Sequence, residues 1–201
     1  MRKRLFDILL SGIALIAASP FLLLISFAIK LEDRGPAFFA QTRVGRHGRL
    51  FELYKLRSMR VPREIGRSSR LITIARDERV TKIGRVIRLS KIDEIPQLVN
   101  VLKGDMSIVG PRPEVPKYVS LWDEELRNEI LSVRPGITDP ASVVFRDESK
   151  VLGQQVDPMR YYEEELIPTK TRMYAEYVRA QTFRGDVRIV IATIRAVLGS
   201  R

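Results

Sequence analysis

Two adjacent acidic residues, Asp93 and Glu94, stand in a basic stretch that includes Arg88 and Lys91. At the start of a helix, cationic neighbours and the helix dipole both favour an ionised carboxylate. Such a carboxylate can attack phosphorus and form an acyl phosphate, while basic side chains hold a diphosphate in place. Acidic residues also occupy many helix starts without any catalytic role, and the local sequence alone favours that structural interpretation.

The geometry of a helix predicts different roles for the two acidic residues. Adjacent helical side chains point about 100° apart, so Asp93 and Glu94 cannot approach one atom in the same way. One nucleophile and one supporting carboxylate is therefore the more consistent division.

Arg112 lies between two prolines, Pro111 and Pro113. The prolines restrict the backbone and would hold the guanidinium in place. A fixed guanidinium suits bidentate binding of phosphate. An ordinary turn carrying a surface arginine explains the same three residues equally well.

The composition indicates a single domain that binds an anionic partner. The chain has 201 residues, no cysteine and a formal net charge of +11. Disulfides and thiolate metal sites are therefore excluded, and the one histidine, His47, cannot build a zinc site alone. Its neighbours Arg46 and Gly48 predict an exposed turn. The positive charge fits lipid headgroups, nucleic acid or a phosphorylated substrate.

The N-terminal part predicts a membrane helix. Residues 8–29 carry no charge and are mostly apolar, which is about the length that crosses a bilayer. A signal peptide is disfavoured, because the run is long and Pro20 follows the only small-residue stretch. Basic residues flank both ends, and positive charge favours the cytoplasmic side.

Ser19 and Pro20 fall near the middle of this apolar run. Proline removes one helical hydrogen bond, and the Ser19 hydroxyl could satisfy the carbonyl that is freed. A helix broken there could enter one leaflet and return. A kinked helix that spans the bilayer fits the residues equally well.

Three further regions have recognisable patterns. Residues 37–58 predict a β-hairpin with a turn at 45–48, and residues 61–70 predict a polar loop. Residues 79–103 predict mainly helix, with Ser90 and Asp93 as a capping box and Gly104 as the C-cap.

Two helices are predicted near the C-terminus. The first covers about 157–180, and the second carries an apolar stripe along one face. Core packing is the default for that stripe, and a position in the membrane interface beside Arg188 and Arg195 is the alternative. The stripe consists of Val187, Val190, Ile191, Ile194, Val197 and Leu198.

The run KIDEIPQLVNVLKGDMSIVGPRP (91–113) closely resembles the signature of the bacterial sugar transferase family, the monotopic phosphoglycosyl transferases. Further segments agree in the same order: the apolar helix with Ser19-Pro20, FFAQTRVGRHGRLFELYKLRSM, RVTKIGRVIRLS and RPGIT. The similarity covers nearly the whole chain and resembles the small, single-domain form.

The resemblance implies a two-step exchange. A UDP-sugar would transfer its phosphosugar to Asp93 and release UMP, and polyprenol phosphate would then attack the acyl phosphate. It implies that Glu94 either helps the lipid phosphate to attack or organises the metal. It also implies that Arg112 binds phosphate and that Lys55 and Arg88 are basic positions near the site. It also implies Mg²⁺, with Asp93 as the best protein ligand and with substrate phosphates and water completing the shell.

The resemblance also implies an architecture. The fold is expected to be α+β and mainly helical, with a small hairpin and interfacial amphipathic helices. Residues 1–34 would form a re-entrant helix broken at Ser19-Pro20, and residues 35–201 the catalytic unit. The expected location is the cytoplasmic face of the bacterial inner membrane, next to anionic phospholipid.

One segment departs from the family pattern. After Arg134-Pro135-Gly136-Ile137-Thr138, many members continue with Gly and then a stretch containing Gln-Val, whereas this chain has residues 139–147, DPASVVFRD. We expect this region to face the nucleotide or the sugar, with Arg146 as a candidate contact. The sequence does not rank the sugar donors.

A different class of protein remains as an alternative. A non-catalytic basic membrane protein that binds anionic lipid or nucleic acid would explain the charge and the apolar helix. It gives no reason for Asp93-Glu94 within a dense polar motif, so we expect no nucleic-acid partner. A homo-oligomer is compatible with the sequence, which leaves the oligomeric state open.

Overall fold

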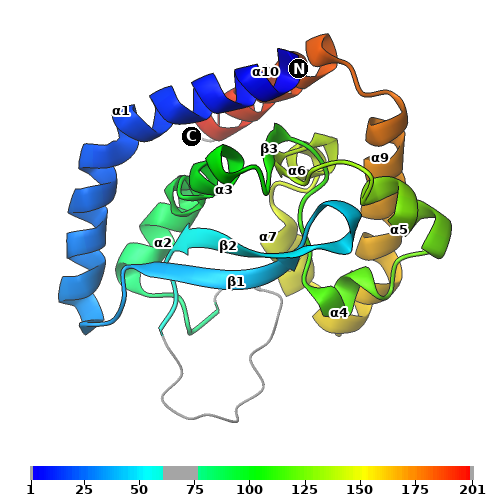
Figure 1. Ribbon diagram of the computed structural model, residues 1–201. Helices are drawn as coiled ribbons and strands as arrows, with labels where there is room; N and C mark the ends of the chain where they lie inside the picture. Colours follow the sequence, from blue (N-terminus) through cyan, green and yellow to red (C-terminus); the bar gives the residue numbers. More distant parts are fainter. Residues whose placement is uncertain (1, 61–76, 200–201) are drawn as a thin grey trace.

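The computed structural model describes residues 2–60 and 77–199, and the predicted loop at 61–70 lies outside these residues. The fold is mainly helical with a small hairpin, as expected, and it contains a second two-stranded sheet that was not predicted (Figure 1). The helices are α1 (Arg2–Asp33), α2 (Lys82–Leu89), α3 (Gln97–Lys103), α4 (Pro116–Val119), α5 (Glu124–Ile130), α6 (Pro140–Val144), α7 (Glu148–Gly153), α8 (Pro158–Tyr161), α9 (Ile167–Arg179) and α10 (Phe183–Leu198).

Helix α1 is continuous through Ser19 and Pro20 instead of broken there, and Figure 1 shows that it bends about midway. Pro20 lacks the N–H that would reach the Ile16 carbonyl in a regular helix. The Ser19 hydroxyl donates to that same carbonyl over 2.8 Å. The predicted role of Ser19 is therefore confirmed, and one side-chain bond preserves the helix at its bend.

The outer surface of α1 is apolar and exposed, with Ile13 at 66%, Ile16 at 77% and Leu23 at 72%. In the described part of the chain, it is the one helix long and apolar enough to cross a membrane. A folded protein in water rarely leaves such a large apolar surface uncovered. Length and composition are thus consistent with a protein that associates with a membrane.

Polar contacts attach the first half of α1 to the rest of the molecule. Asp7 is buried and accepts from the Ser107 hydroxyl at 2.8 Å and from the Ile108 N–H at 3.2 Å. Lys3 reaches Asp186 at the start of α10 over 2.6 Å. These buried charge-assisted bonds fix the direction in which α1 leaves the domain.

The second half of α1 ends against α2. The Glu32 carboxylate accepts from the N–H groups of Lys82, at 2.8 Å, and Ile83, at 3.3 Å, in the first turn of α2. Asp33 pairs with the buried Arg57. α1 therefore makes polar contacts with the domain near both of its ends.

The predicted hairpin is present as β1 (Phe38–Val44) and β2 (Leu50–Leu56), joined by the short turn η1 (Arg46–Gly48). His47 is exposed in that turn, as predicted. Asn100 of α3 accepts from the Tyr54 N–H at 3.1 Å and donates to the Glu52 carbonyl at 2.7 Å. These two bonds fasten β2 to the helix that follows the acidic pair.

A two-stranded parallel sheet positions the Pro-Arg-Pro segment. β3 (Ser107–Val109) pairs with β4 (Gly136–Thr138), which lies in the RPGIT segment. Gly110 and Gly136 meet so closely that a Cβ on Gly136 would lie 2.1 Å from the Gly110 nitrogen. The Gly136 N–H donates to the Pro111 carbonyl over 2.9 Å. Arg112 therefore projects from a backbone fixed on both sides.

The region predicted as one helix, 79–103, is interrupted before the acidic pair. α2 ends at Leu89, and Ser90 donates back to the Val86 carbonyl, so Ser90 is a C-cap and the predicted capping box is wrong. Lys91 has φ 58°, and Asp93 and Glu94 form the 3₁₀ turn η2 (Ile92–Glu94). α3 then begins after Pro96 and ends at Gly104, which is the predicted C-cap.

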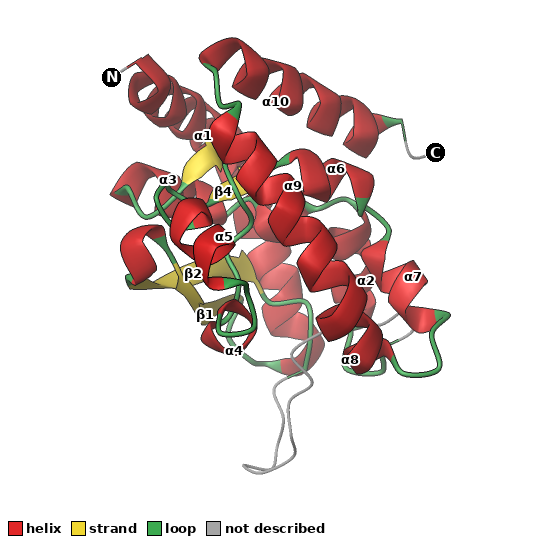
Figure 2. Ribbon diagram, turned by 90° about the vertical axis from the view of Figure 1, so that its right-hand side faces the viewer, coloured by secondary structure: helices red, strands yellow, loops and turns green. Residues whose placement is uncertain are grey.

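The C-terminal helices agree with the prediction. α8, a π-helical turn (Tyr162–Leu166) and α9 form one run, and α10 follows. Tyr118, Trp122 and Tyr174 lie in the largest core cluster, beneath α9. α10 lies beside α6 across the upper end of α9 (Figure 2). Its stripe is divided, because Val190 packs on a core cluster whereas Ile191 and Ile194 stay exposed.

Gly84 of α2 lies against the backbone of Ser58, just after the end of β2. A Cβ at this position would lie 2.0 Å from the Ser58 carbonyl oxygen, which is backbone and cannot rotate away. We expect Gly84→Ala to destabilise the fold by roughly 1–3 kcal/mol through overpacking. Thermal unfolding measures the effect. Gly12→Ala is the matched control, because nothing lies within 4 Å of a Cβ there.

Candidate active site

Glu94 is held by two cationic side chains from distant parts of the sequence. Arg112 donates to Glu94 Oε1 at 2.6 Å and to Oε2 at 3.4 Å. Lys55 of β2 donates to Oε1 at 3.3 Å. The side chain of Glu94 is 15% exposed, that of Lys55 22% and that of Arg112 30%. The predicted residues Lys55, Glu94 and Arg112 are therefore brought together.

This arrangement determines the protonation state of Glu94. Burial acts to raise the pKa of its carboxyl, but the charges of Arg112 and Lys55 outweigh burial and hold the pKa well below its usual range. Burial in turn lowers the pKa of Lys55, and Glu94 opposes that effect. Glu94 is thus a tethered carboxylate that is ionised at neutral pH.

Asp93 has a different environment. It is 6% exposed, and its Oδ1 atom is buried without a hydrogen-bond partner among the described residues. Burial raises the pKa of Asp93, Lys55 lowers it, and Glu94 raises it further. The cationic neighbours and the helix start predicted a lowered pKa for Asp93; the direction of this shift is wrong, because desolvation exceeds the effect of the cations.

Two more cations lie around Asp93. Arg88 and Lys91 both act to lower the pKa of Asp93. Arg88 also donates to the Ser58 hydroxyl over 3.4 Å, which directs it from α2 toward the end of the hairpin. Arg146 makes no hydrogen bond or ion pair with Asp93, Glu94 or their cationic neighbours in the part of the chain that the structure describes.

A buried polar group that was not among the predicted site residues supports Arg112. Arg43 of β1 donates to the Pro113 carbonyl at 3.2 Å and to Glu114 at 3.1 Å. The Tyr162 hydroxyl donates to the other Glu114 oxygen at 2.9 Å. Arg43 thus holds the carbonyl immediately after Arg112. Two features of the sequence could have predicted this group. Gln41 and Arg43 alternate along one strand, and the carboxylate of Glu114 directly follows Pro113.

Replacing Glu94 by glutamine should leave Arg112 and Lys55 without their shared counter-ion. A fully buried pair loses roughly 3–5 kcal/mol when one partner is removed, and the partial exposure of Arg112 reduces the expected loss to about 2 kcal/mol. Denaturant unfolding at pH 7 in the presence of a chelator measures this loss of stability.

The pH dependence provides the control for this prediction. Because the pKa of Glu94 is depressed in the folded state, its contribution is fully present above its ordinary pKa of 4.5 and declines as the pH falls below that value. Wild type and Glu94→Gln should therefore converge in acid. A gap in stability that stays constant down to pH 3 would contradict the assignment.

The described residues include no group of three or more acidic or histidine side chains that could hold a metal ion. The unpartnered Oδ1 of Asp93 is one oxygen that could bind a cation. Glu94 is less suited, because Arg112 and Lys55 already occupy its oxygens. A bound divalent ion would therefore take most of its ligands from substrate and water.

The chain is similar in sequence to several known proteins. The family model "Bacterial sugar transferase" matches residues 1–200. A Bacillus subtilis protein, named as a candidate undecaprenyl-phosphate N-acetylgalactosaminyl 1-phosphate transferase, is 48% identical over 68% of the chain. The undecaprenyl-phosphate glucose phosphotransferase of Komagataeibacter xylinus is 38% identical over the whole chain. The Caulobacter vibrioides UDP-glucose:undecaprenyl-phosphate glucose-1-phosphate transferase is 36% identical over 98%.

The matched regions cover 70% of the Bacillus and Caulobacter proteins and 36% of the Komagataeibacter protein. The relatives are thus transferases of sugar phosphates to undecaprenyl phosphate. Given a family match over almost every residue, the chain belongs to the bacterial sugar transferase family.

Proposed function

We propose that this protein transfers a sugar 1-phosphate from a UDP-sugar to polyprenol phosphate through a covalent intermediate on Asp93. The observation that carries the proposal is the contrast within the acidic pair. Glu94 is tethered by Arg112 and Lys55, whereas Asp93 keeps a buried oxygen without a partner among the described residues, near Lys55.

The first step forms a bond between an Asp93 oxygen and the phosphorus that carries the sugar. The bond from that phosphorus to the bridging oxygen breaks, and UMP leaves with the electron pair. In the second step an oxygen of polyprenol phosphate attacks the same phosphorus. The Asp93 carboxylate departs, and polyprenyl-diphospho-sugar is released. No oxidant or additional proton carrier is needed for either step.

The different environments of the two carboxylates support Asp93 as the nucleophile. A carboxylate with a raised pKa is more basic, and basicity generally accompanies nucleophilicity. Glu94 has a depressed pKa, and two cations engage its oxygens, so it is the weaker nucleophile. Its role in this proposal is to hold Arg112 and Lys55 at the site.

Arg112, Lys55 and Arg88 are the proposed diphosphate-binding residues. Phosphoryl transfer depends mainly on positioning and on stabilising charge in the transition state. A guanidinium fixed by its backbone costs little ordering when it binds phosphate. We assign Arg146 no role at the phosphate, and contact with the nucleotide or the sugar remains a proposal for that residue.

Mg²⁺ is the proposed cofactor, and the chemistry of the donor set fits it in part. Asp93 offers one free carboxylate oxygen, which is typical of sites where substrate phosphates complete the shell. When bound, the ion would neutralise charge on the diphosphate. Asp93 would then orient the diphosphate through its carboxylate.

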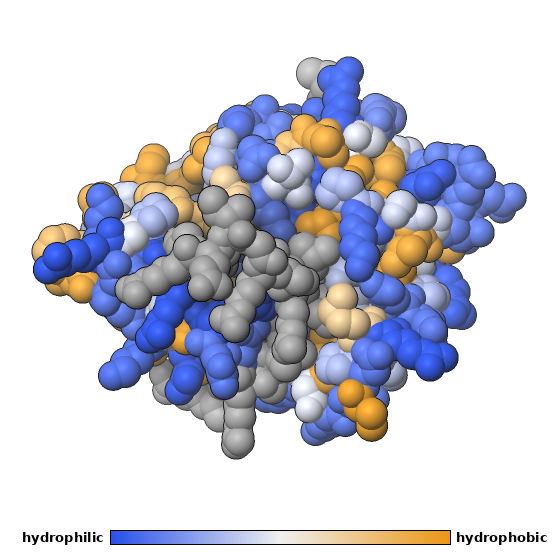
Figure 3. Space-filling view, turned by 90° about the horizontal axis from the view of Figure 1, so that it is seen from below, coloured by the Kyte–Doolittle hydropathy of each residue, from blue (hydrophilic) through white to orange (hydrophobic). Residues whose placement is uncertain are grey.

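We further propose that α1 is re-entrant and that the protein lies on the cytoplasmic face of the inner membrane. The basic residues at both ends of α1, its bend and its contacts with the domain near both ends support this topology. Exposed apolar residues of α2 and α10, including Val86, Leu89 and Ile194, would lie in the interface beside anionic phospholipid. The face turned away from α10 is mainly hydrophilic (Figure 3).

An assay of UMP release tests the proposed function. It uses a panel of UDP-sugars together with polyprenol phosphate and Mg²⁺. We expect release with at least one donor and formation of the lipid-linked product. Binding to anionic liposomes without UMP release from any UDP-sugar would instead favour a non-catalytic membrane protein.

A further inference from the structure

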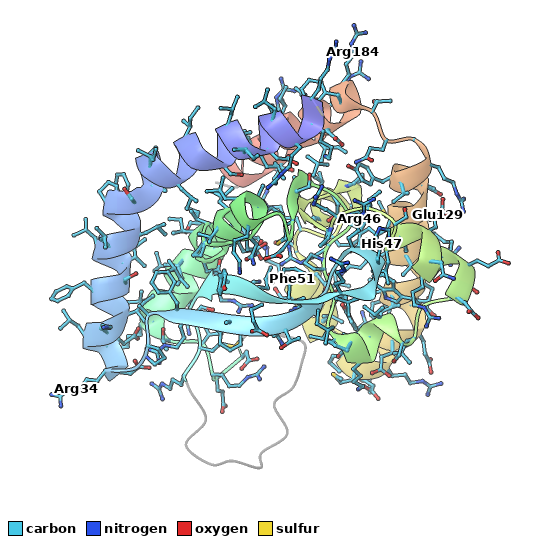
Figure 4. All side chains as sticks on the ribbon, viewed as in Figure 1. Arg34, Arg46, His47, Phe51, Glu129 and Arg184 are labelled. Atoms are coloured by element: carbon cyan, nitrogen blue, oxygen red, sulfur yellow. The ribbon has the colours of Figure 1, made fainter. Side chains whose placement is uncertain are left out.

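A second basic concavity lies at the turn end of the hairpin. Its volume is about 320 Å³, and its lining includes Arg46, His47, Arg49, Phe51, Asp105 and Arg134. Figure 4 shows Arg46, His47 and Phe51 together at the end of the hairpin. None of these residues belongs to the group around Asp93 and Glu94. Three arginines and one aspartate line the concavity, so positive charge is in excess on its walls.

Two of the three guanidinium groups are fixed by backbone carbonyls. Arg46 donates through Nε to the Ser132 carbonyl at 2.8 Å, and Arg134 donates through Nε to the Gly104 carbonyl at 2.8 Å. A guanidinium has five N–H donors, so each keeps its two terminal nitrogens for another acceptor. Fixed guanidinium groups lose little conformational entropy when they bind an anion.

The backbone of the turn is also fixed in an unusual conformation. His47 has φ 56°, in the left-handed region that residues other than glycine seldom adopt. Its N–H donates to the Leu131 carbonyl over 2.7 Å, and Gly45 and Arg49 close the turn through a 2.8 Å bond. The imidazole of His47 therefore lies on the wall of a preformed concavity.

The one acidic group on the walls does not neutralise the arginines. Asp105 lies 3.7 Å from Lys103, and no described carboxylate forms an ion pair with Arg46, Arg49 or Arg134. Buried or clustered cations without counter-ions attract anions. The side chain of Arg49 is exposed and makes no hydrogen bond or ion pair with the residues that the structure describes, so its charge is available.

We propose that Arg46, Arg49, Arg134 and His47 form a second anion site, which binds a phosphate or diphosphate group apart from Asp93. Guanidinium groups bind phosphate oxygens in a bidentate manner, and a volume of about 320 Å³ admits an inorganic diphosphate or a phospholipid headgroup. The proposal is independent of the chemistry at Asp93 and holds whether or not that residue is a nucleophile.

His47 provides a direct probe, because it is the only histidine in the chain. Its imidazole signals in ¹H–¹⁵N NMR spectra of the full-length protein in detergent are therefore unambiguous. Addition of inorganic pyrophosphate should shift these signals saturably. Sodium chloride at matched ionic strength should produce no saturable shift.

Two substitutions locate the effect. Arg49→Gln removes one free guanidinium, and we expect the apparent Kd for pyrophosphate at His47 to rise by about tenfold or more. Arg184→Gln is the matched control, because Arg184 is an exposed arginine at the start of α10, at the top of the view in Figure 4 and away from the hairpin turn. It should leave the titration unchanged.

Two further samples identify the source of the phosphate. A shift with pyrophosphate in detergent assigns the site to a soluble phosphate ligand. If the His47 signals shift only in nanodiscs of phosphatidylglycerol, and not in nanodiscs of phosphatidylcholine, the site binds an anionic lipid headgroup. No saturable shift in either sample, or equal loss in Arg49→Gln and Arg184→Gln, would overturn the proposal. Failure of UMP release would leave this result unaffected.

Discussion

Replacing Asp93 by asparagine should lower kcat/KM for UMP release by at least about 10³-fold without loss of stability. Removal of a covalent nucleophile typically has an effect of this size or larger. The asparagine keeps the shape of the side chain, but its amide cannot form the acyl phosphate. The initial rate of UMP release, measured with one UDP-sugar at varied concentration, gives this change in kcat/KM.

The stability of Asp93→Asn separates a catalytic from a structural role. Because the folded state raises the pKa of Asp93, ionisation is harder in the fold than in the unfolded chain. Its charge therefore lowers stability at neutral pH, above both pKa values. Without metal, the asparagine variant should have an equal or higher Tm. Loss of activity together with a lower Tm would favour a structural role.

Substitution of Arg112 should produce the second largest loss. Arg112→Gln removes a guanidinium that faces the proposed diphosphate, and loss of one such donor typically lowers kcat by about 10²–10³-fold. Arg112→Lys keeps the charge but not the planar, bidentate geometry, so only part of the activity should remain. Steady-state kinetics with a saturating lipid acceptor measures both variants.

A double variant distinguishes the role of Arg112 in stability from its role in catalysis. Arg112→Gln should destabilise the fold, because Glu94 loses its strongest partner. Combining it with Glu94→Gln removes both charges, so the loss of stability should be less than the sum of the single effects. Activity should stay low in the double variant. Recovery of activity along with stability would show that Arg112 acts only as a structural ion pair.

Local patterns were sufficient to predict much of the fold. The structure confirms three predictions that depend only on nearby residues. They are the hairpin at residues 37–58, the helix C-cap at Gly104 and the helices after residue 157. The Ser19 hydroxyl was predicted for the same reason, because the carbonyl that Pro20 frees lies within one helical turn.

The interrupted helix and the true pairing of charges could not be predicted from local patterns. Ser90 can cap a helix at either end, and only the left-handed backbone of Lys91 decides between them. The partners of Glu94, Lys55 and Arg112, are 39 and 18 positions away along the chain. Their convergence depends on how the hairpin packs on α3, through Asn100, and on the pairing of β3 with β4.

Burial explains why the pKa of Asp93 is raised, although its cationic neighbours predicted a lowered pKa. Sequence proximity reveals the cations near a carboxylate, but it does not reveal how much water the fold removes. Desolvation is the largest influence on the pKa of Asp93, and it outweighs the charges of Lys55, Arg88 and Lys91. At Glu94 the balance is reversed, because Arg112, together with Lys55, overcomes desolvation.

Intact-protein mass spectrometry tests the central claim most directly. The protein is mixed with Mg²⁺ and a UDP-sugar from which it releases UMP, and polyprenol phosphate is left out. The proposed mechanism predicts an added mass equal to one sugar phosphate, located on Asp93 by peptide mapping and absent from Asp93→Asn. Addition of polyprenol phosphate should remove it and yield the lipid product. UMP release that requires the lipid, with no adduct on the protein, would contradict the covalent mechanism.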